Sequence, residues 1–242
     1  MELYFQPVAD LHTHTLASPH AYSTLTENAA AAAARGMLAV ACTDHGPEVR
    51  DGMHPWHFGN MRILPDHIAG VRHLRGVEVN VCDFQGRLDL SDGYLNKLEI
   101  VIASMHNGTM PLGTPEQITE TWLEVAKNPL VDIIGHCGTP LYTFDYEAVI
   151  PVFGQYGKVV EINEGTFRVR NDSLENCRRV AALCKQHGVR VAVNSDAHYH
   201  EHVGQLENAI ALLQELEFPL ELIINSSRER FEEFLKEKQL SL

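Results

Sequence analysis

Ile100-Val101-Ile102-Ala103-Ser104-Met105-His106 is a short apolar run that ends in a histidine, and the same pattern recurs along the chain. Comparable runs occupy residues 10–12, 40–45, 77–79, 133–136, 159–163, 191–196 and 222–225. Nearly continuous apolar strands that alternate with helix-length segments are typical of a parallel sheet buried on both faces. The runs therefore predict an α/β fold.

Helix start and stop signals lie between these runs. The predicted helices start at the capping box of Thr24 and Glu27, at Thr114-Pro115 and at Asp172-x-x-Glu175, and they end at Gly36, Asn128-Pro129 and Gly188. Seven or eight β/α units in 242 residues favour a TIM-like barrel over an open doubly wound sheet. Periodicity leaves open whether the barrel closes, and we expect residues 1–242 to form a single domain.

Composition narrows the class of protein. The chain has 19 basic and 32 acidic residues, a net charge of −13, which disfavours extended binding to nucleic acid or to an anionic membrane. Its five cysteines include no C-x-x-C pair, which is typical of a reduced, intracellular protein. Because Met1-Glu2-Leu3-Tyr4 lacks a basic signal-peptide region and no apolar run approaches a membrane span, we expect a cytoplasmic chain.

Histidines and acidic residues follow most of the predicted strands. Because residues two apart on a strand share a side, His12 and His14 lie together, as do Asp196 and His198. The carboxyl ends of parallel strands form one rim, where such side chains converge. The candidates for a metal site are His12, His14, His20, His45, Glu78, His106, His136, Asp196 and His198.

Nine imidazoles and carboxylates are too many for one ion, since a catalytic zinc usually has three protein ligands and a water. They suit two or three divalent ions, with zinc, manganese and iron all compatible with these donors. We assign packing or surface roles to the other histidines outside the rim, His67, His73 and His187, and regard His200 and His202 as weak candidates.

Several neighbouring residues have an expected supporting or structural role. Asp10 and Asp44 lie close to candidate ligands in the sequence and are expected to orient an imidazole, although a capping role for Asp44 is equally compatible. Glu161 and Asn163 share one side of their strand and either line the pocket or fill the interior. Cys137 follows His136, so strand alternation directs it into the core.

These motifs resemble the PHP (polymerase and histidinol phosphatase) superfamily. The resemblance rests on Asp10-Leu11-His12-Thr13-His14-Thr15, Thr43-Asp44-His45-Gly46, the strand of Glu78, His106, His136 and Ser195-Asp196-Ala197-His198. Ser18-Pro19-His20-Ala21-Tyr22-Ser23 and His54-Pro55-Trp56-His57-Phe58 are similar to the YcdX-like phosphatases within it.

The resemblance implies a distorted (β/α)7 barrel with a trinuclear centre, usually of zinc. It assigns His12, His14, Glu78 and Asp196 to one ion, Glu78, His106 and His136 to a second, and His20, His45 and His198 to a third. The run at 222–225 is one strand more than such a barrel has and is expected to be a short closing segment. The resemblance also suggests a homo-oligomer.

Clustered divalent ions suit hydrolysis of a small phosphate monoester by a metal-bound hydroxide. His57 is a candidate for the general acid, and Arg62, Arg168 and Arg170 are candidates for phosphate binding at the rim. An amidohydrolase that cleaves C–N bonds, a metal-dependent nuclease and a non-catalytic metal-binding domain are the alternatives. An amidohydrolase often has a carboxylated lysine where Glu78 lies here, and a nuclease requires a basic groove.

Overall fold

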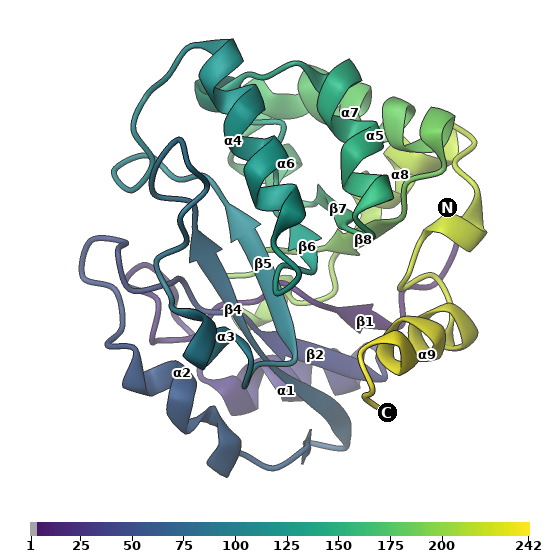
Figure 1. Ribbon diagram of the computed structural model, residues 1–242. Coiled ribbons are helices and arrows are strands. Elements are labelled where there is room, and N and C mark those ends of the chain that lie inside the picture. Colours follow the sequence, from purple (N-terminus) through teal and green to yellow (C-terminus); the bar gives the residue numbers. More distant parts are fainter. Residues whose placement is uncertain (1–3) are drawn as a thin grey trace.

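Short parallel strands wrap around a common axis in chain order, as the computed structural model of residues 4–242 shows (Figure 1). The neighbours follow the order β1-β2-β4-β5-β6-β7-β8, and β3 pairs antiparallel with β4. The strands are β1 (Ala9–Asp10), β2 (Ala39–Cys42), β3 (His67–Ile68), β4 (Val71–Asn80), β5 (Ile100–Ser104), β6 (Ile133–Ile134), β7 (Val159–Asn163) and β8 (Val191–Asn194).

Helices cover the outside of these strands, with α4, α5 and α7 on one side in Figure 1. They are α1 (Leu25–Ala34), α2 (Trp56–Asn60), α3 (Asp92–Leu95), α4 (Pro115–Lys127), α5 (Tyr146–Gln155), α6 (Gly165–Arg168), α7 (Leu174–His187), α8 (Glu207–Glu215) and α9 (Arg228–Glu237). Short 3₁₀ helices are η1 (Met61–Ile63), η2 (Pro140–Tyr142), η3 (Asn171–Ser173), η4 (His200–His202) and η5 (Leu220–Leu222).

Two of the three predicted helix starts are confirmed. Thr24 and Thr114 both form reciprocal capping boxes. The start predicted at Asp172 is wrong, because residues 171–173 form η3 and α7 begins at Leu174 without a side-chain cap. The helix ends as predicted at Gly188, whose φ of +67° is the left-handed conformation that glycine adopts without steric cost.

The barrel is nearly closed between its first and last strands. Thr13 forms a bridge with Ala197. The run at 222–225 is not a regular strand, but Ile223 bridges Val191, and Asn225 lies between β1 and β8. The Asn225 side-chain amide donates to Ala9 O (2.8 Å) and Val193 O (2.7 Å) and accepts from Val193 N. A closing segment therefore completes a distorted, TIM-like barrel of seven parallel strands.

The barrel interior has an apolar half and a polar half. Ile100 and Ile102 of β5 pack inside with Phe231 and Phe234 of α9, which seals the end where the strands begin. The alternate residues of the same strands pack against the outer helices, as the strand period of two requires. The next inward-facing residue along β5, two positions after Ile102, is the polar Ser104, which is also buried. The carboxyl ends of the strands therefore enclose a buried polar site.

Two expectations from composition concern the whole described chain. All five cysteines are buried and free, as expected for reduced thiols, and Cys137 lies in the core as predicted. Among the helices of residues 4–242, none combines the length and apolar character needed to cross a bilayer.

Candidate metal centre

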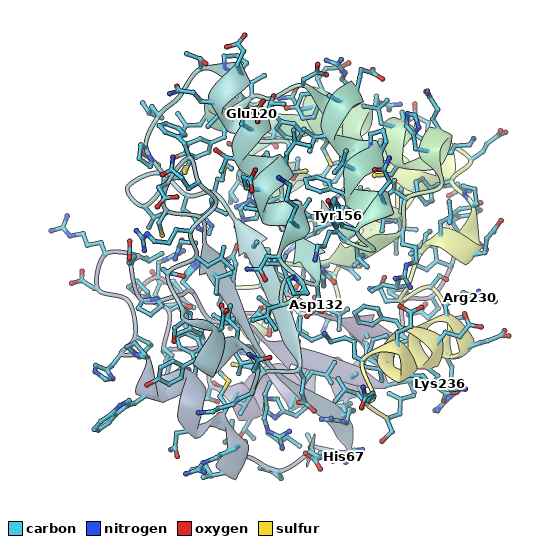
Figure 2. The ribbon with its side chains drawn as sticks, viewed as in Figure 1. His67, Glu120, Asp132, Tyr156, Arg230 and Lys236 are labelled. Carbon is cyan, nitrogen blue, oxygen red and sulfur yellow. The ribbon has the colours of Figure 1, made fainter. Side chains whose placement is uncertain are left out.

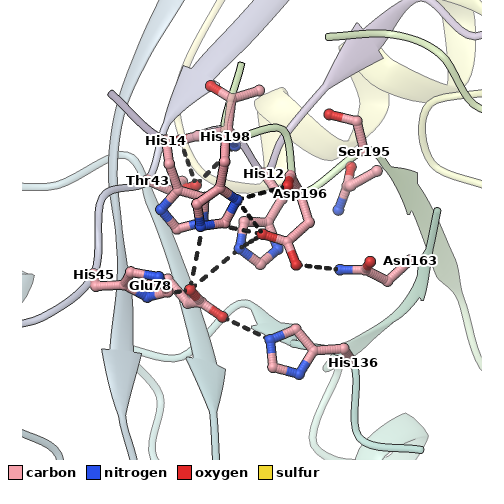
Figure 3. A network of polar contacts seen from close by, with 12 residues as sticks. His12, His14, Thr43, His45, Glu78, His136, Asn163, Ser195, Asp196 and His198 are labelled. Carbon is pink, nitrogen blue, oxygen red and sulfur yellow. Dashed lines mark hydrogen bonds and ion pairs between the residues drawn. The ribbon is translucent and has the colours of Figure 1, made fainter. Parts of the chain in front are cut away.

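The nine candidate side chains form one contiguous cluster at the carboxyl ends of the strands. Figure 3 shows most of these groups around a common space, namely His12, His14, His45, Glu78, His136, Asp196 and His198. The imidazole of His20 folds back from its loop to lie 4.4 Å from that of His198, measured between ring centroids. His106 completes the cluster beside His45, at 5.0 Å between ring centroids.

Four of these groups form a cage of tetrahedral dimensions. The Nε2 atom of His12 lies 3.4 Å from Glu78 Oε2 and 3.5 Å from Asp196 Oδ1. The Nε2 atom of His14 lies 3.5 Å and 3.1 Å from the same two oxygens. A zinc ion about 2.0 Å from each of four tetrahedral ligands requires ligand separations of about 3.3 Å. The residues present therefore fit a divalent ion at this position.

Glu78 divides its two oxygens between different imidazoles. Its Oε1 atom faces His136 Nε2 at 2.9 Å and His106 Nε2 at 3.3 Å. Its Oε2 atom faces His45 Nδ1 at 2.7 Å, as well as the cage formed with His12 and His14. A fully buried carboxylate with imidazole nitrogens close to both oxygens has the arrangement of a ligand that bridges two ions.

Buried polar atoms in the cluster lack hydrogen-bond partners. They are His12 Nε2, both ring nitrogens of His45, Glu78 Oε2 and His198 Nε2. Buried polar atoms in folded proteins are normally paired, because an unpaired one costs about 1–3 kcal/mol. Five such atoms within one cluster indicate that the site binds ions that would satisfy them.

The ring nitrogens that face away from the cluster have hydrogen-bond partners. Nδ1 of His12 lies 2.7 Å from Glu161 Oε1, and Nδ1 of His14 lies 3.1 Å from Ser18 Oγ. Nδ1 of His106 lies 2.7 Å from Asn80 Oδ1, and Nδ1 of His198 lies 3.0 Å from the Asp196 carbonyl oxygen. When Nδ1 donates to such an oxygen, Nε2 keeps its lone pair and the ring is held in one orientation. This is the arrangement that a metal-binding imidazole requires.

Burial and mutual proximity keep some of the imidazoles neutral. Burial, followed by the nearby His45 and His198, lowers the pKa of His14 to about 3. The same causes lower the pKa of the more exposed His20 to about 4. Burial opposes ionisation of Glu78, but the imidazoles of His106, His12 and His45 hold its pKa well below its ordinary value. Neutral His14 and His20 and ionised Glu78 are in the protonation states in which these groups bind metals.

Two of the candidate ligands have an unusual backbone conformation. His136 has a φ of +23° and Asp196 a φ of +54°, values that residues other than glycine rarely adopt. Such strain costs about 1–3 kcal/mol per residue and persists where the surrounding structure determines it. Both residues lie two positions after the end of a strand, His136 after β6 and Asp196 after β8, with their side chains in the cluster.

Asp44 has the expected role of supporting a candidate ligand, but Asp10 does not. Asp44 accepts hydrogen bonds from Thr15 and from Ser18 Oγ (2.7 Å), and Ser18 in turn contacts His14, so Asp44 supports a ligand indirectly. The prediction for Asp10 is wrong. Its carboxylate accepts from Ser195 and from Gly204 N and contacts no imidazole, so it joins two loops instead.

Two supporting residues were not assigned this role from the sequence. The sequence left open whether Glu161 lines the pocket or fills the interior. The structure places it in the interior, where its carboxylate contacts His12, Asn194 and the backbone N of His136. Asn80, which binds His106, was missed altogether. Its position two residues after Glu78 on the same strand was the available signal, because residues at that spacing share a side.

Of the three arginines expected to bind phosphate, only Arg170 lines the cavity over the cluster. Its guanidinium donates to Asp196 Oδ2 (2.5 Å) and Asn163 Oδ1 (3.0 Å). Arg168 instead donates to the side chain of Gln205, because it lies on α6 and points away from the cavity. Arg62 lies on η1 and lines a separate hollow. The placement of Arg62 and Arg168 at the phosphate site is therefore not supported.

His57 does not face the cavity either. Its Nε2 atom lies 3.7 Å from Asp44 Oδ2 and is buried. Burial opposes ionisation of the Asp44 carboxyl, but this contact, together with His14 and Thr15, holds its pKa well below its ordinary value. Because Asp44 lies between His57 and the cluster, His57 is not positioned to protonate a leaving group in the cavity.

The remaining histidines lie outside the cluster, as expected. His67, at the lower edge of Figure 2, belongs to β3 beside the start of β4. His73 is buried within β4 and not in a helix or loop, and its side chain faces Pro65 O. His187 ends α7, whereas His200 contacts Ser23 and His202 lies in η4.

Comparison with known proteins agrees with this geometry. The PHP domain family matches residues 10–165 of the chain. A protein of Acetivibrio thermocellus named "Probable phosphatase" is 43% identical over 96% of both chains. A protein of Thermoanaerobacter sp. with the same description is 45% identical, again over 96% of each chain.

Solved structures show the same fold at low sequence identity. The chain is similar to the histidinol phosphate phosphatase of Lactococcus lactis, solved with zinc, L-histidinol and phosphate, with a TM-score of 0.62 and 15% identity over 88% of this chain and 95% of that one. A protein of Acinetobacter baumannii described as a "probable 2-pyrone-4,6-dicarboxylic acid hydrolase" gives a TM-score of 0.54 at 13% identity, over 94% of this chain and 98% of that one. On the family match and the full-length relatives, the chain belongs to the PHP domain family.

Proposed function

We propose that this chain is a metal-dependent phosphatase that hydrolyses a small phosphate monoester at a centre of three divalent ions of the zinc type. The observation that carries the proposal is the position of Glu78, whose two oxygens face separate sets of imidazoles next to a cavity with an arginine in its wall. The name that the relatives share, phosphatase, supports the same reaction.

The proposed ligand sets are those that the resemblance to the PHP superfamily implies. His12, His14, Glu78 and Asp196 would hold the first ion, and Glu78, His106 and His136 the second. His20, His45 and His198 would hold the third. The nitrogens of His45 and His198 come close enough to His14 to share an ion with it, so His14 lies between the first set and the third.

Divalent ions in such a centre supply a nucleophile at neutral pH and neutralise the oxygens of a phosphoryl group. The chain itself contributes the guanidinium of Arg170, held against Asp196 and Asn163, with a buried Nε that has no partner. A guanidinium matches the geometry of two phosphate oxygens. Arg170 therefore binds and orients the phosphoryl group beside the centre.

The cavity limits the size of the substrate. Its volume is about 300 Å³, and Asn107, Thr109 and the loop residue Arg50 also line it. This volume lies at the lower end of the range for small-molecule sites, about 300–1,000 Å³. We therefore propose a small phosphorylated compound and not a nucleic acid strand. The amidohydrolase alternative is less well supported, because within residues 4–242 no lysine lines this cavity and Glu78 takes the bridging position.

Release of phosphate from p-nitrophenyl phosphate, measured with and without a chelator, tests the function. We expect turnover by the purified protein, loss of it on chelation, and recovery when zinc or manganese is added back. Hydrolysis of amides without hydrolysis of phosphate esters would refute the proposal and favour the amidohydrolase.

Replacement of Arg170 by alanine is expected to lower kcat/KM for p-nitrophenyl phosphate by roughly 10²-fold, because one charged contact to the phosphoryl group is lost. Arg168→Ala is the matched control, since Arg168 is two residues away and binds Gln205. Steady-state kinetics of both variants, with their metal content, give the comparison. Equal losses for the two variants would show that Arg170 has no special role.

A further inference from the structure

A second and larger hollow lies apart from the metal centre, between α2, η1 and α3. Its volume is about 820 Å³, and it shares no lining residue with the cavity over the histidine cluster. Figure 1 shows α2 and α3 side by side on the same flank of the barrel. Its lining includes the buried Met61 and the side chains of Trp56, Arg62, Tyr94 and Lys97.

The hollow is electropositive although the chain carries a net charge of −13. Within residues 4–242, no acidic side chain lines it, and neither Arg62 nor Lys97 has a carboxylate within ion-pair distance, although the Lys97 ammonium lies 5.5 Å from the centre of the Tyr94 ring. Most other arginines of the described chain contact a carboxylate, as Arg87 contacts Glu48 and Arg178 contacts Glu215. Two unpaired cations that face one hollow create a local site for an anion.

The same hollow presents two aromatic rings. The side chain of Trp56 is 74% exposed, which is unusual for the most hydrophobic of the large rings. Tyr94 packs directly on the backbone of α2, where a Cβ at Gly59 would lie 2.8 Å from its ring. A glycine inside a helix costs about 1 kcal/mol relative to alanine, so this close approach of Tyr94 is maintained at the expense of helix stability.

We propose that the hollow binds a small aromatic anion of the nucleotide class, with its ring against the exposed Trp56 and its phosphate on Arg62 and on Lys97, which lies over the Tyr94 ring. Stacking of a base on an exposed aromatic side chain contributes binding energy for every base type. Guanidinium and ammonium groups supply charge-assisted hydrogen bonds to phosphate oxygens. The volume falls within the range that small-molecule sites occupy.

A chain of contacts connects this hollow to the metal centre. His57 lines the hollow, and its Nε2 lies 3.7 Å from Asp44 Oδ2. Asp44 accepts a hydrogen bond from Ser18, which contacts Nδ1 of the candidate ligand His14. A ligand that contacts His57 therefore lies next to the hydrogen-bonded groups that orient His14. A molecule bound in the hollow can in this way act as an effector of the metal centre.

Tryptophan fluorescence reports this binding directly, because the chain has two tryptophans and Trp122 is buried at 1% exposure. The probe is the phosphonate analogue of adenosine 5′-monophosphate, in which a methylene group replaces the ester oxygen so that hydrolysis cannot occur. Titration of the metal-loaded protein is expected to quench the emission of Trp56 to saturation. Adenosine alone and inorganic phosphate alone are expected to bind at least about tenfold more weakly, since adenosine lacks the charged group and phosphate lacks the aromatic ring.

Two lysine variants locate the site. Lys97→Glu is expected to raise the dissociation constant of the phosphonate about tenfold or more, which corresponds to loss of one charged contact. Lys236→Glu is the matched control, because Lys236 is a lysine of α9 outside the hollow. Metal content and turnover of p-nitrophenyl phosphate are expected to stay unchanged in both variants, which shows that each is folded.

The proposal is overturned if the phosphonate does not change Trp56 emission at millimolar concentration, or if the two lysine variants bind it equally. Quenching by inorganic phosphate that matches the phosphonate would overturn the aromatic class of ligand. Sedimentation in the absence of ligand tests whether a second copy of this chain fills the hollow instead. A dimer in which Trp56 is shielded from a soluble quencher would show this and would overturn the proposal.

Discussion

Replacing Glu78 by glutamine is expected to remove at least two of the bound ions and to lower turnover of p-nitrophenyl phosphate by about 10³-fold or more. The side chain is fully buried, and each oxygen faces a different set of imidazoles. Glutamine keeps the shape but removes the negative charge, and its amide nitrogen cannot donate a lone pair to a cation. Elemental analysis and steady-state kinetics of the same preparation measure both effects.

Glu164→Gln is the matched control for this change. Glu164 is also buried and follows β7, but its carboxylate accepts from Asn208 and Ala209 and not from the histidine cluster. We expect this variant to keep its metal and its turnover, at some loss of thermal stability. If Glu78→Gln retained the metal content of the wild-type protein, the bridging role assigned to Glu78 would be wrong.

His106→Ala is expected to abolish turnover with the fold preserved. The His106 Nε2 atom lies 3.3 Å from Glu78 Oε1, and Asn80 holds the ring through Nδ1. Its removal leaves the second ion with Glu78 and His136 alone, so we expect the loss of one ion while the others stay. Added imidazole, which fits the space of the missing ring, is expected to restore part of both metal binding and activity.

His67→Ala is the control here, because His67 is exposed on β3 beside the beginning of the barrel strands. Circular dichroism and thermal unfolding of both variants establish that they are folded. Unchanged activity of His106→Ala would refute its assignment as a ligand. Loss of all metal from this variant would contradict the separate sets of ligands.

The strand ends were the most informative part of the sequence. A period of two places alternate residues on one side, and parallel strands bring their carboxyl ends to one rim, so the convergence of His12, Glu78 and His136 was predictable. The capping boxes at Thr24 and Thr114 were also predictable, because both partners lie within one turn. These signals are local, or they follow directly from the topology.

The loops were not predictable by the same reasoning. Arg168 and Arg170 are two residues apart, yet Arg168 at the end of α6 donates to Gln205, whereas Arg170 beyond the helix donates to Asp196. His57 was one candidate for the general acid, but Asp44 lies between His57 and the histidine cluster. The direction of a loop side chain depends on contacts with distant segments, and no periodicity encodes those contacts.

The residues that hydrogen-bond to the candidate ligands were also not predictable, because a polar residue that faces the barrel interior can either line the pocket or support a ligand. Glu161 lies on the inner side of β7, and strand alternation alone does not distinguish a pocket wall from a support for His12. Asp10 shows the converse, since a carboxylate close to a ligand in sequence bonds Ser195 and Gly204 instead. Hydrogen-bond partners are decided by where strands far apart in sequence come to lie.

The number of divalent ions in each purified chain tests the central claim most directly, namely that one rim of the barrel binds several cations beside a phosphate cavity. Elemental analysis of the wild-type protein, after dialysis to remove loosely bound metal, gives this number. The account predicts about three ions per chain. A count of one or none would contradict it.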